Sequence, residues 1–267
     1  LRTRRQRQMC IRDRSSTRGT RINHGYWLSF ISSTSLSASE LTNTVSCFNV
    51  GSRLNMTNKV PNKIGSNSNT EQPSRCDWCG DNQLYQQYHD TEWGVPCFDE
   101  QTLFEFLLLE GAQAGLSWIT ILNKRETYRQ AFDQFDAESI ARYDSKKIEA
   151  LMNNTGIVRN QLKIKSAINN AQRLLDLHLR GETLTDHLWR YVDGEPLQNQ
   201  WHKLSDVPAS TELSDKISKD FKKLGFTFFG STICYAFMQA TGMTNDHLVS
   251  CYRHAECQHI AKSGRNC

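Results

Sequence analysis

A succession of short helical patterns between residues 84 and 251 constrains the fold of this chain more than any other feature. Apolar residues recur at helical spacing in segments that Gly, Pro or capping residues separate. One run alone, 226–229, has the aromatic and β-branched composition of a strand. We therefore predict a mostly all-α fold with a single domain over 75–260. The predicted helices cover 84–90, 99–110, 118–132, 137–143, 145–152, 159–179, 185–192, a segment that starts within 206–214 and ends at 224, 231–241, and 246–251.

Residues 1–74 differ in composition from this domain. They are rich in Ser, Thr, Asn and Arg, and such a segment buries too little apolar surface to offset its ordering entropy. We predict that 1–74 and the tail 261–267 are disordered. An Arg-rich, acid-poor N-terminus is typical of organelle transit peptides. The missing initial Met and the stretch 5–14, which resembles translated non-coding sequence, favour an artefact instead, with Met56 as the candidate start.

The net charge of +4 belongs to the N-terminal extension. Residues 1–70 carry 11 Lys and Arg against two acidic residues, whereas the remainder carries 21 against 26. Nucleic-acid binding by the domain would therefore need a local basic patch. No apolar run approaches the ~20 residues of a membrane-spanning helix. We expect a cytoplasmic monomer without membrane contact, associated with the nucleoid if it is bacterial.

The cysteines predict a metal site. Nine cysteines without regular pairing argue against a disulfide framework and favour a reducing compartment. Cys76 and His89 lie near the start of the domain, and His247 and Cys251 near its end, where i, i+4 spacing would place them on one helix face. A zinc ion coordinated by both clusters would join the two ends of the domain. The spacing leaves the ligand set open, because other residues compete: Cys79, His254, Cys257 and His259.

The stretch 109–118 combines a carboxylate, two glycines and a tryptophan. Glu110 lies at the C-terminal end of an apolar helix, which is unfavourable for the helix dipole and for burial. The small residues that follow allow a ligand to approach closely. With Trp78, Tyr88, Trp93 and Trp118, this carboxylate suits a flat cationic ring, which aromatic faces stack on and a carboxylate hydrogen-bonds. Each aromatic residue alone is more often part of a core, so the combination carries the prediction.

A turn around Gly156 joins two predicted helices, and Arg159 and Lys163 follow it. Exposed backbone N–H groups beside a helix N-terminus suit a phosphate group. The turn resembles a helix-hairpin-helix DNA-binding turn, although most glycine-containing turns between helices only reverse the chain.

Several stretches of the chain resemble the DNA-3-methyladenine glycosylase I (Tag) family. They are 75–78, 88–96, 109–120, 229–240 and 245–247, and the likeness extends over about 76–251. The resemblance implies a helix-hairpin-helix glycosylase domain in which one structural zinc ion joins the N- and C-terminal segments. It also implies hydrolysis of the N-glycosidic bond of 3-methyladenine in alkylated double-stranded DNA.

The resemblance assigns roles to individual residues. Glu110, the candidate catalytic residue, would hydrogen-bond the flipped base together with Tyr88, and Trp118 would stack on it. Trp78 and Trp93 would complete the pocket. Gly115 and Leu116 would enter the gap left in the DNA. The residues contacting the DNA backbone would be Gly156, Arg159 and Lys163. The zinc ligands would be Cys76, His89, His247 and Cys251.

The implied chemistry is simple. Methylation at N3 makes adenine a cation and a good leaving group, so flipping and selective binding of the base suffice for much of the catalysis. The segments 78–94 and 110–121 contain no lysine, which predicts a monofunctional enzyme without a Schiff base. Two alternatives are a non-catalytic, zinc-containing DNA-binding module and an unrelated helical hydrolase with a catalytic zinc ion.

Overall fold

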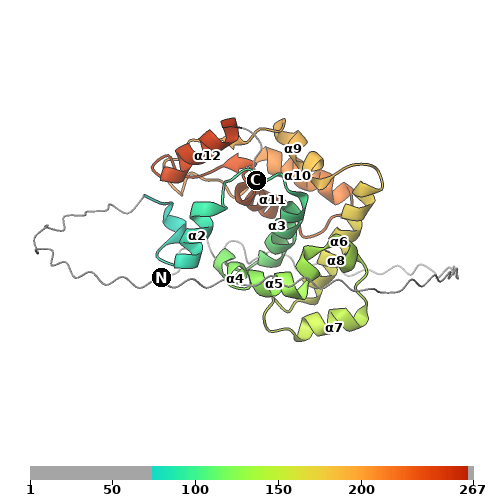
Figure 1. The fold of residues 1–267 in the computed structure, drawn as a ribbon. Coiled ribbons are helices and arrows are strands. Elements are labelled where there is room, and N and C mark those ends of the chain that lie inside the picture. Colours follow the sequence, from blue (N-terminus) through green and yellow to red (C-terminus); the bar gives the residue numbers. More distant parts are fainter. Residues whose placement is uncertain (1–73, 264–267) are drawn as a thin grey trace, which may run out of the picture. The chain divides into compact units, whose positions relative to one another are not determined.

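Helix α3 (Glu100–Gln113) is the central helix of residues 74–263, the part of the chain that this computed structural model describes. Asp99 caps it by accepting a hydrogen bond from the N–H of Thr102 at 2.8 Å. Residues 103–112 are all buried, because other helices pack around α3 (Figure 1). They include α4 (Trp118–Leu122), α8 (Gln161–His178), α9 (Leu184–Trp189) and α11 (Ser231–Ala240). A helix that is apolar on every face is typically buried in this way.

The other elements of the N-terminal half are short helices and turns before and after α3. A 3-10 turn, η1 (Asp77–Cys79), leads to α2 (Gln83–Thr91). After α4 come α5 (Arg125–Ala131), η2 (Asp133–Phe135), α6 (Ala137–Ala141) and α7 (Ser145–Asn153). Helix α6 packs against α8.

The C-terminal half ends beside the first described residues, since the N–H of Tyr252 donates to the carbonyl of Ser74. The elements after α9 are η3 (Arg190–Val192), β1 (Leu197–Gln198), α10 (Glu212–Lys223), α11, β2 (Thr244–Asn245) and α12 (Tyr252–Ser263). The two short strands pair in parallel, with Leu197 opposite Thr244 and Gln198 opposite Asn245. None of the helices within 74–263 is long and apolar enough to cross a membrane.

The prediction of a mostly helical fold is confirmed, with three local corrections. The predicted helix 118–132 is two helices, α4 and α5, separated at Asn123 and Lys124. The predicted strand 226–229 is wrong. The side chain of Asn170 pairs with the backbone of Thr227 at 2.8 and 2.9 Å, as a neighbouring strand would. Phe228 then takes a φ of +54°, which ends the extended conformation.

The third correction concerns 246–251, which forms a loop rather than a helix. The buried Asp246 carboxylate accepts hydrogen bonds from four side chains outside the loop and so fixes it: Asn199, Trp201, Tyr235 and Gln239. The helix of this region is α12, which begins at Tyr252 and continues to Ser263, into the predicted tail. The predictions for 1–73, including Met56, and for 264–267 lie outside the described residues.

The turn between α7 and α8 needs glycine at position 156 because α5 lies against it. A Cβ atom on Gly156 would come within 2.1 Å of Thr127 Cγ2 and 3.0 Å of Thr127 Cβ. The amide N–H of Val158 donates to the Tyr128 hydroxyl group at 3.0 Å, which also ties the turn to α5. The position of the turn therefore depends on this close approach.

We predict that Gly156→Ala lowers the free energy of unfolding by roughly 1–3 kcal/mol, the usual cost of overpacking. Urea denaturation measures this. Adding Thr127→Ala, which removes the overlapping methyl group, is expected to restore most of the loss. Thr127→Ala alone is the control, because it removes the same methyl group without adding a Cβ at position 156. Equal stability of Gly156→Ala and the unmodified protein would contradict the packing account.

Candidate functional site

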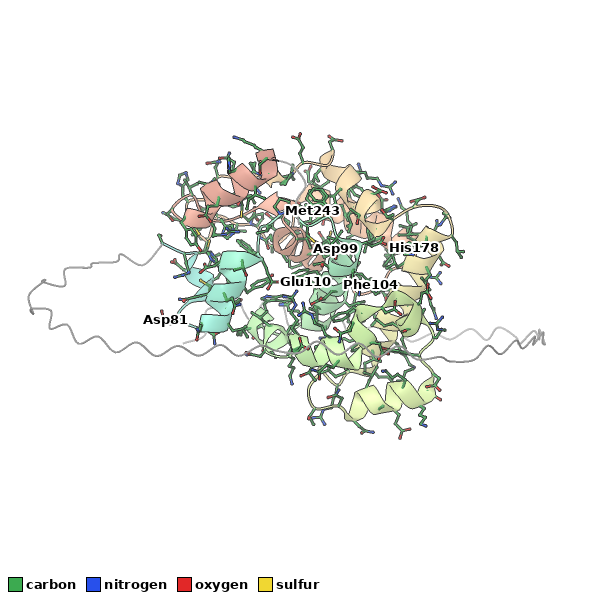
Figure 2. The ribbon with its side chains drawn as sticks, in the orientation of Figure 1. Asp81, Asp99, Phe104, Glu110, His178 and Met243 are labelled. Atoms are coloured by element: carbon green, nitrogen blue, oxygen red, sulfur yellow. The ribbon has the colours of Figure 1, made fainter. Side chains whose placement is uncertain are left out.

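Two buried carboxyl groups on α3 have opposite surroundings. Glu105 accepts from Arg125 Nε at 2.5 Å and lies 3.0 Å from Arg129 Nη2. Glu110, only 4% exposed, makes no hydrogen bond or ion pair with any described residue, and Figure 2 places it in the interior. Burial alone raises its pKa to about 8. A buried carboxyl group without a partner is costly, so this position is suited to a ligand that supplies donors.

Aromatic side chains contact one another on and beside α2, and the charge of Glu110 acts on two of them, Tyr85 and Tyr88. We call this group the aromatic cluster: Trp78, Tyr85, Tyr88, Trp93 and Trp118. The ring centroids of Trp78 and Trp93 lie 4.9 Å apart, and those of Tyr88 and Trp118 lie 5.5 Å apart. Burial, and next the charge of Glu110, raises the pKa of Tyr88, and the same two causes raise that of Tyr85 to about 12. The structure therefore brings together the predicted residues of the base pocket.

The aromatic cluster also holds unused hydrogen-bond donors. The indole N–H groups of Trp78 and Trp118 are buried and have no hydrogen-bond partner within residues 74–263. Buried polar groups in folded proteins are nearly always paired, so each exception requires an explanation. Unused donors on two tryptophans, beside an unused carboxyl group, fit a flat ligand that both donates and accepts hydrogen bonds.

Sequence reasoning missed three residues that build this site. Tyr85 lies one helical turn before Tyr88 on α2, and that i, i+3 spacing is the signal that identifies it. Phe106 stacks on Trp118, with ring planes 18° apart. Arg125 lies 5.0 Å from the Phe106 ring and also donates to Glu92, beside Trp93, at 2.5 Å. Arg125 thus joins α2, α3 and α5 behind the aromatic cluster, and no local pattern in the sequence indicates this role.

An exposed turn follows α3, and we call it the wedge turn (residues 113–116). The N–H of Leu116 donates to the carbonyl of Gln113 at 2.7 Å. Ala114 has φ −42° and ψ 116°, and Gly115 has φ +81°, which are the values of a type II β-turn with its usual glycine. Leu116 is 38% exposed. The predicted DNA-entering residues, Gly115 and Leu116, therefore lie on the exposed part of a defined turn that directly follows the helix carrying Glu110.

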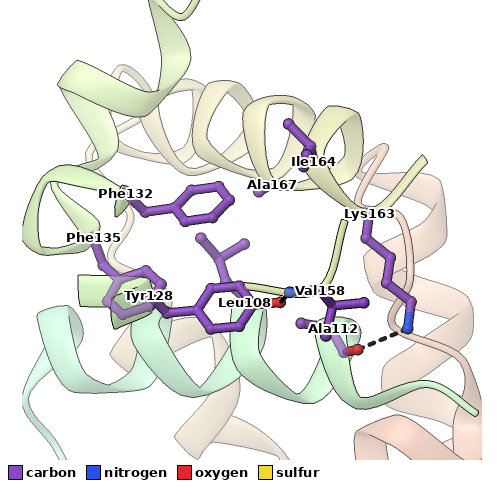
Figure 3. Close-up of a pocket in the computed structure, with 9 residues that line it drawn as sticks. All are labelled: Leu108, Ala112, Tyr128, Phe132, Phe135, Val158, Lys163, Ile164 and Ala167. Atoms are coloured by element: carbon purple, nitrogen blue, oxygen red, sulfur yellow. Dashed lines mark hydrogen bonds between the residues drawn. The ribbon is translucent and has the colours of Figure 1, made fainter. Parts of the chain in front are cut away.

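The predicted backbone-contacting residues lie around a second turn, which we call the hairpin turn (residues 154–160). The side chain of Asn154 accepts from the N–H of Gly156 at 2.8 Å, so that amide already has a partner. Arg159 is exposed. Lys163 is half-buried, and its ammonium group donates to the carbonyls of Ala112 and Ala114 at the end of α3, as Figure 3 shows for Ala112. Burial lowers the pKa of Lys163.

Four buried residues from the two ends of the domain form a possible metal site: Cys76, His89, His247 and Cys251. Their ligand atoms all lie within 4.8 Å of one another. The Nδ1 atom of His89 is 2.8 Å from Asp90, and Nε2 of His247 is 2.9 Å from the carbonyl of Trp93. These contacts leave one ring nitrogen of each histidine directed at the cysteines. Two thiols and two oriented imidazoles match a structural zinc site.

The competing residues do not join this group. The Cys79 thiol donates to the carbonyl of Cys76, and Nε2 of His254 lies 2.8 Å from the carbonyl of Asn199. Cys257 is buried and His259 is exposed. Among the described residues, the ligand atoms that lie close together are those of the first set. His247 and Cys251 belong to a loop and the residue before α12, so the predicted shared helix face is wrong.

A helical fold that buries an unpaired carboxyl group within an aromatic cluster, beside an exposed wedge turn, defines a protein built to bind a flat, hydrogen-bonding ring. The methyladenine glycosylase family model matches residues 78–254. A DNA-3-methyladenine glycosylase of Haemophilus influenzae is 48% identical over 178 residues, which are 67% of this chain and 96% of the relative. The chain belongs to the methyladenine glycosylase family.

Solved structures agree with this assignment. A crystal structure of 3-methyladenine DNA glycosylase I is 50% identical, with a TM-score of 0.66, over 67% of this chain and 98% of the other. A structure concerned with 3-methyladenine recognition by the Staphylococcus aureus glycosylase is 35% identical, with a TM-score of 0.65, over 67% and 95% of the two chains. The likeness covers the part of the chain in which the site lies.

We predict that Arg125→Met lowers the free energy of unfolding by roughly 1.5–3 kcal/mol, because it removes a charged hydrogen bond from the buried Glu105, which then keeps Arg129 alone, and another from Glu92. Urea denaturation measures the loss. Arg142→Met removes a guanidinium group from an exposed pair with Glu138 and is expected to change stability by less than ~0.5 kcal/mol. Equal effects of the two substitutions would contradict the role assigned to Arg125.

Proposed function

We propose that this protein removes 3-methyladenine from alkylated double-stranded DNA by hydrolysing its N-glycosidic bond, and that it acts as a monofunctional monomer. The observation that carries the proposal is the unpaired, buried carboxyl group of Glu110 within the aromatic cluster. Membership in the methyladenine glycosylase family supports it. So does the relative from Staphylococcus aureus, whose structure concerns recognition of this base.

The aromatic cluster supplies what such a base needs. A purine flipped out of the duplex is held by stacking and by hydrogen bonds to its edge. Trp118 would stack on the ring, while Glu110 and Tyr88 would contact its polar edge. Trp78 and Trp93 would close the remaining sides. A bound cation would favour the ionised form of Glu110. The resulting carboxylate favours a cationic base over a neutral one, so binding discriminates against normal adenine.

The reaction then needs little acid catalysis. N3-methylation places a positive charge on the base before the enzyme acts. When the bond between C1′ and N9 breaks, its electron pair neutralises that charge, and the base leaves without taking up a proton. A water oxygen bonds to C1′, and its surplus proton passes to solvent. Positive charge passes to C1′ of the deoxyribose as the bond weakens. Glu110 would therefore bind the cationic base first, and would accelerate the step by stabilising the charge that develops at C1′.

The two turns would position the DNA. Leu116 on the wedge turn would fill the space left by the flipped nucleotide, as apolar side chains do in other proteins that unstack DNA. The hairpin turn would hold the phosphate backbone as a helix-hairpin-helix motif. The N–H groups of Thr155, Arg159 and Gln161 have no partner among the described residues, and such groups suit a phosphate.

The four-residue Cys/His group would hold one zinc ion. The ion would supply no chemistry to the reaction, but would cross-link the segment before α2 to the loop after β2. Its ligands adjoin the aromatic cluster, since His89 follows Tyr88 and His247 contacts the carbonyl of Trp93. The folded metal site would therefore hold the tryptophan and tyrosine side chains in place.

We predict that Glu110→Gln and Glu110→Ala each slow the release of 3-methyladenine by roughly 10- to 100-fold, since a charged hydrogen bond contributes ~1.5–3 kcal/mol. Chromatography of bases released from methylated DNA measures this. Glu149→Gln, an exposed carboxylate on α7, is the control. A non-catalytic DNA-binding module would bind DNA but release no base in any form. Full release by both Glu110 variants would refute the role of Glu110.

We also predict that chelation lowers the melting temperature, because the binding energy of a structural metal stabilises the folded state. Metal content and thermal unfolding are measured on the same samples. Cys76→Ser is expected to lose the metal, and Cys79→Ser to retain it. An unchanged melting temperature with abolished base release would instead identify a hydrolase with a catalytic metal.

A further inference from the structure

Lys163 connects two parts of the molecule that the proposed function treats separately. It lies in the first turn of α8, directly after the hairpin turn, yet its ammonium group extends to the end of α3. There it donates to the carbonyls of Ala112 and Ala114, each at 2.7 Å. Its aliphatic part runs beside a small cavity lined by residues such as Leu108 and Val158 (Figure 3). The charge is thus already paired with backbone carbonyls of the protein itself.

The second of these carbonyls has a special place in the wedge turn. Types I and II β-turns differ in the orientation of their central peptide: ψ of the second residue changes from about −30° to about +120°, and φ of the third from about −90° to about +80°. Here that peptide joins Ala114 to Gly115, and its carbonyl is the one that Lys163 binds. Lys163 therefore holds the group whose orientation makes this turn type II and directs Leu116.

The other carbonyl, that of Ala112, anchors the Lys163 ammonium group at the end of α3. The last carbonyls of a helix lack partners within it and carry partial negative charge. A lysine ammonium group between the Ala112 and Ala114 carbonyls satisfies both and fixes the end of α3 relative to the start of the wedge turn. Charge-assisted hydrogen bonds of this kind are about twice as strong as neutral ones.

We propose that Lys163 is a positioning residue, which holds the wedge turn in the conformation that enters DNA and couples it to the hairpin turn. The inference rests on the proposed function of Leu116 as the residue that fills the gap in the duplex. Contact of the hairpin turn with the phosphate backbone would then also place Leu116, because the two turns are joined through one side chain. This differs from the role of Lys163 as a phosphate-contacting residue.

The test compares Lys163→Met with Lys165→Met in the full chain. Methionine keeps the length of the side chain but removes its donors. Lys165 is exposed and makes no hydrogen bond or ion pair with the described residues, so its substitution removes a nearby charge alone. Single-turnover release of 3-methyladenine is measured on methylated duplex DNA and on methylated single-stranded DNA. Tryptophan fluorescence measures the affinity for free 3-methyladenine, and the salt dependence of duplex binding is measured as well.

Lys163→Met is expected to slow release from duplex DNA roughly tenfold or more, as the loss of two charge-assisted hydrogen bonds allows. Release from single strands, which need no unstacking, and affinity for the free base should change less than about twofold. The salt dependence should remain that of the unmodified protein. Lys165→Met should leave single-turnover release unchanged at saturating enzyme.

Three results would overturn the proposal. If Lys163→Met lowers the slope of log K against log salt by about 1 and releases base normally at saturation, Lys163 is a phosphate contact. If free-base affinity falls in parallel with release, the residue supports the pocket and not the wedge turn. If Leu116→Ala slows duplex release and Lys163→Met does not, the positioning role is refuted while the proposed function stands.

Leu116→Ala separates the inference from the function on which it rests. If Leu116→Ala itself releases base from duplex DNA at the normal rate, the proposed role of Leu116 fails. If Leu116→Ala does slow release from duplex DNA, the double variant with Lys163→Met should slow it by less than about twofold further, because both substitutions act on the same turn. If the effects of Leu116→Ala and Lys163→Met on the release rate were fully additive, the two residues would not act through the same turn, which would contradict the proposal.

Discussion

The unpaired carboxyl group of Glu110 is the constraint on which the rest of the structure depends. Its pKa of about 8 lies far above the usual value for a glutamate. The folded state therefore binds a proton that the unfolded state releases, so Glu110 lowers stability progressively as pH rises from about 4.5 to about 8. Five residues earlier, Glu105 is equally buried but paired with two arginines. The fold thus pairs one buried carboxyl group on α3, that of Glu105, whereas Glu110 has no partner among the described residues.

The contacts that stabilise the domain also fix the shape of the site. Arg125 supports Phe106, which in turn supports Trp118. The Cys/His group lies directly behind the other aromatic side chains: the rings of Trp93 and His247 are 4.6 Å apart. Buried Asp246, bound by several donors, fixes the loop that presents His247. Contacts of this kind limit the movement of the three tryptophans, because Phe106 packs on Trp118 and the histidines of the Cys/His group pack on Trp78 and Trp93.

Local signals in the sequence predict most of the helices but only part of the site. Helix α3 follows Asp99, the predicted start of that helix, and α10 begins within the predicted range 206–214. Errors occur where side chains distant in sequence decide the backbone, as Asn170 does for Thr227 and the partners of Asp246 do for 246–251. The inward direction of Lys163 is likewise set by carbonyl groups about 50 positions away. Glu110 stands out in the sequence because a carboxylate in an apolar helix breaks the local rule.

The titration of Glu110 tests the central claim most directly. Carbon-13 NMR of glutamate labelled at the side-chain carboxyl group, with Glu110→Gln to assign the signal, follows this one group between pH 4 and 10. The account predicts a midpoint near 8, because burial without a partner disfavours the carboxylate. A midpoint near the ordinary glutamate value of about 4.3 would show that the group is solvated or paired, and would contradict the account.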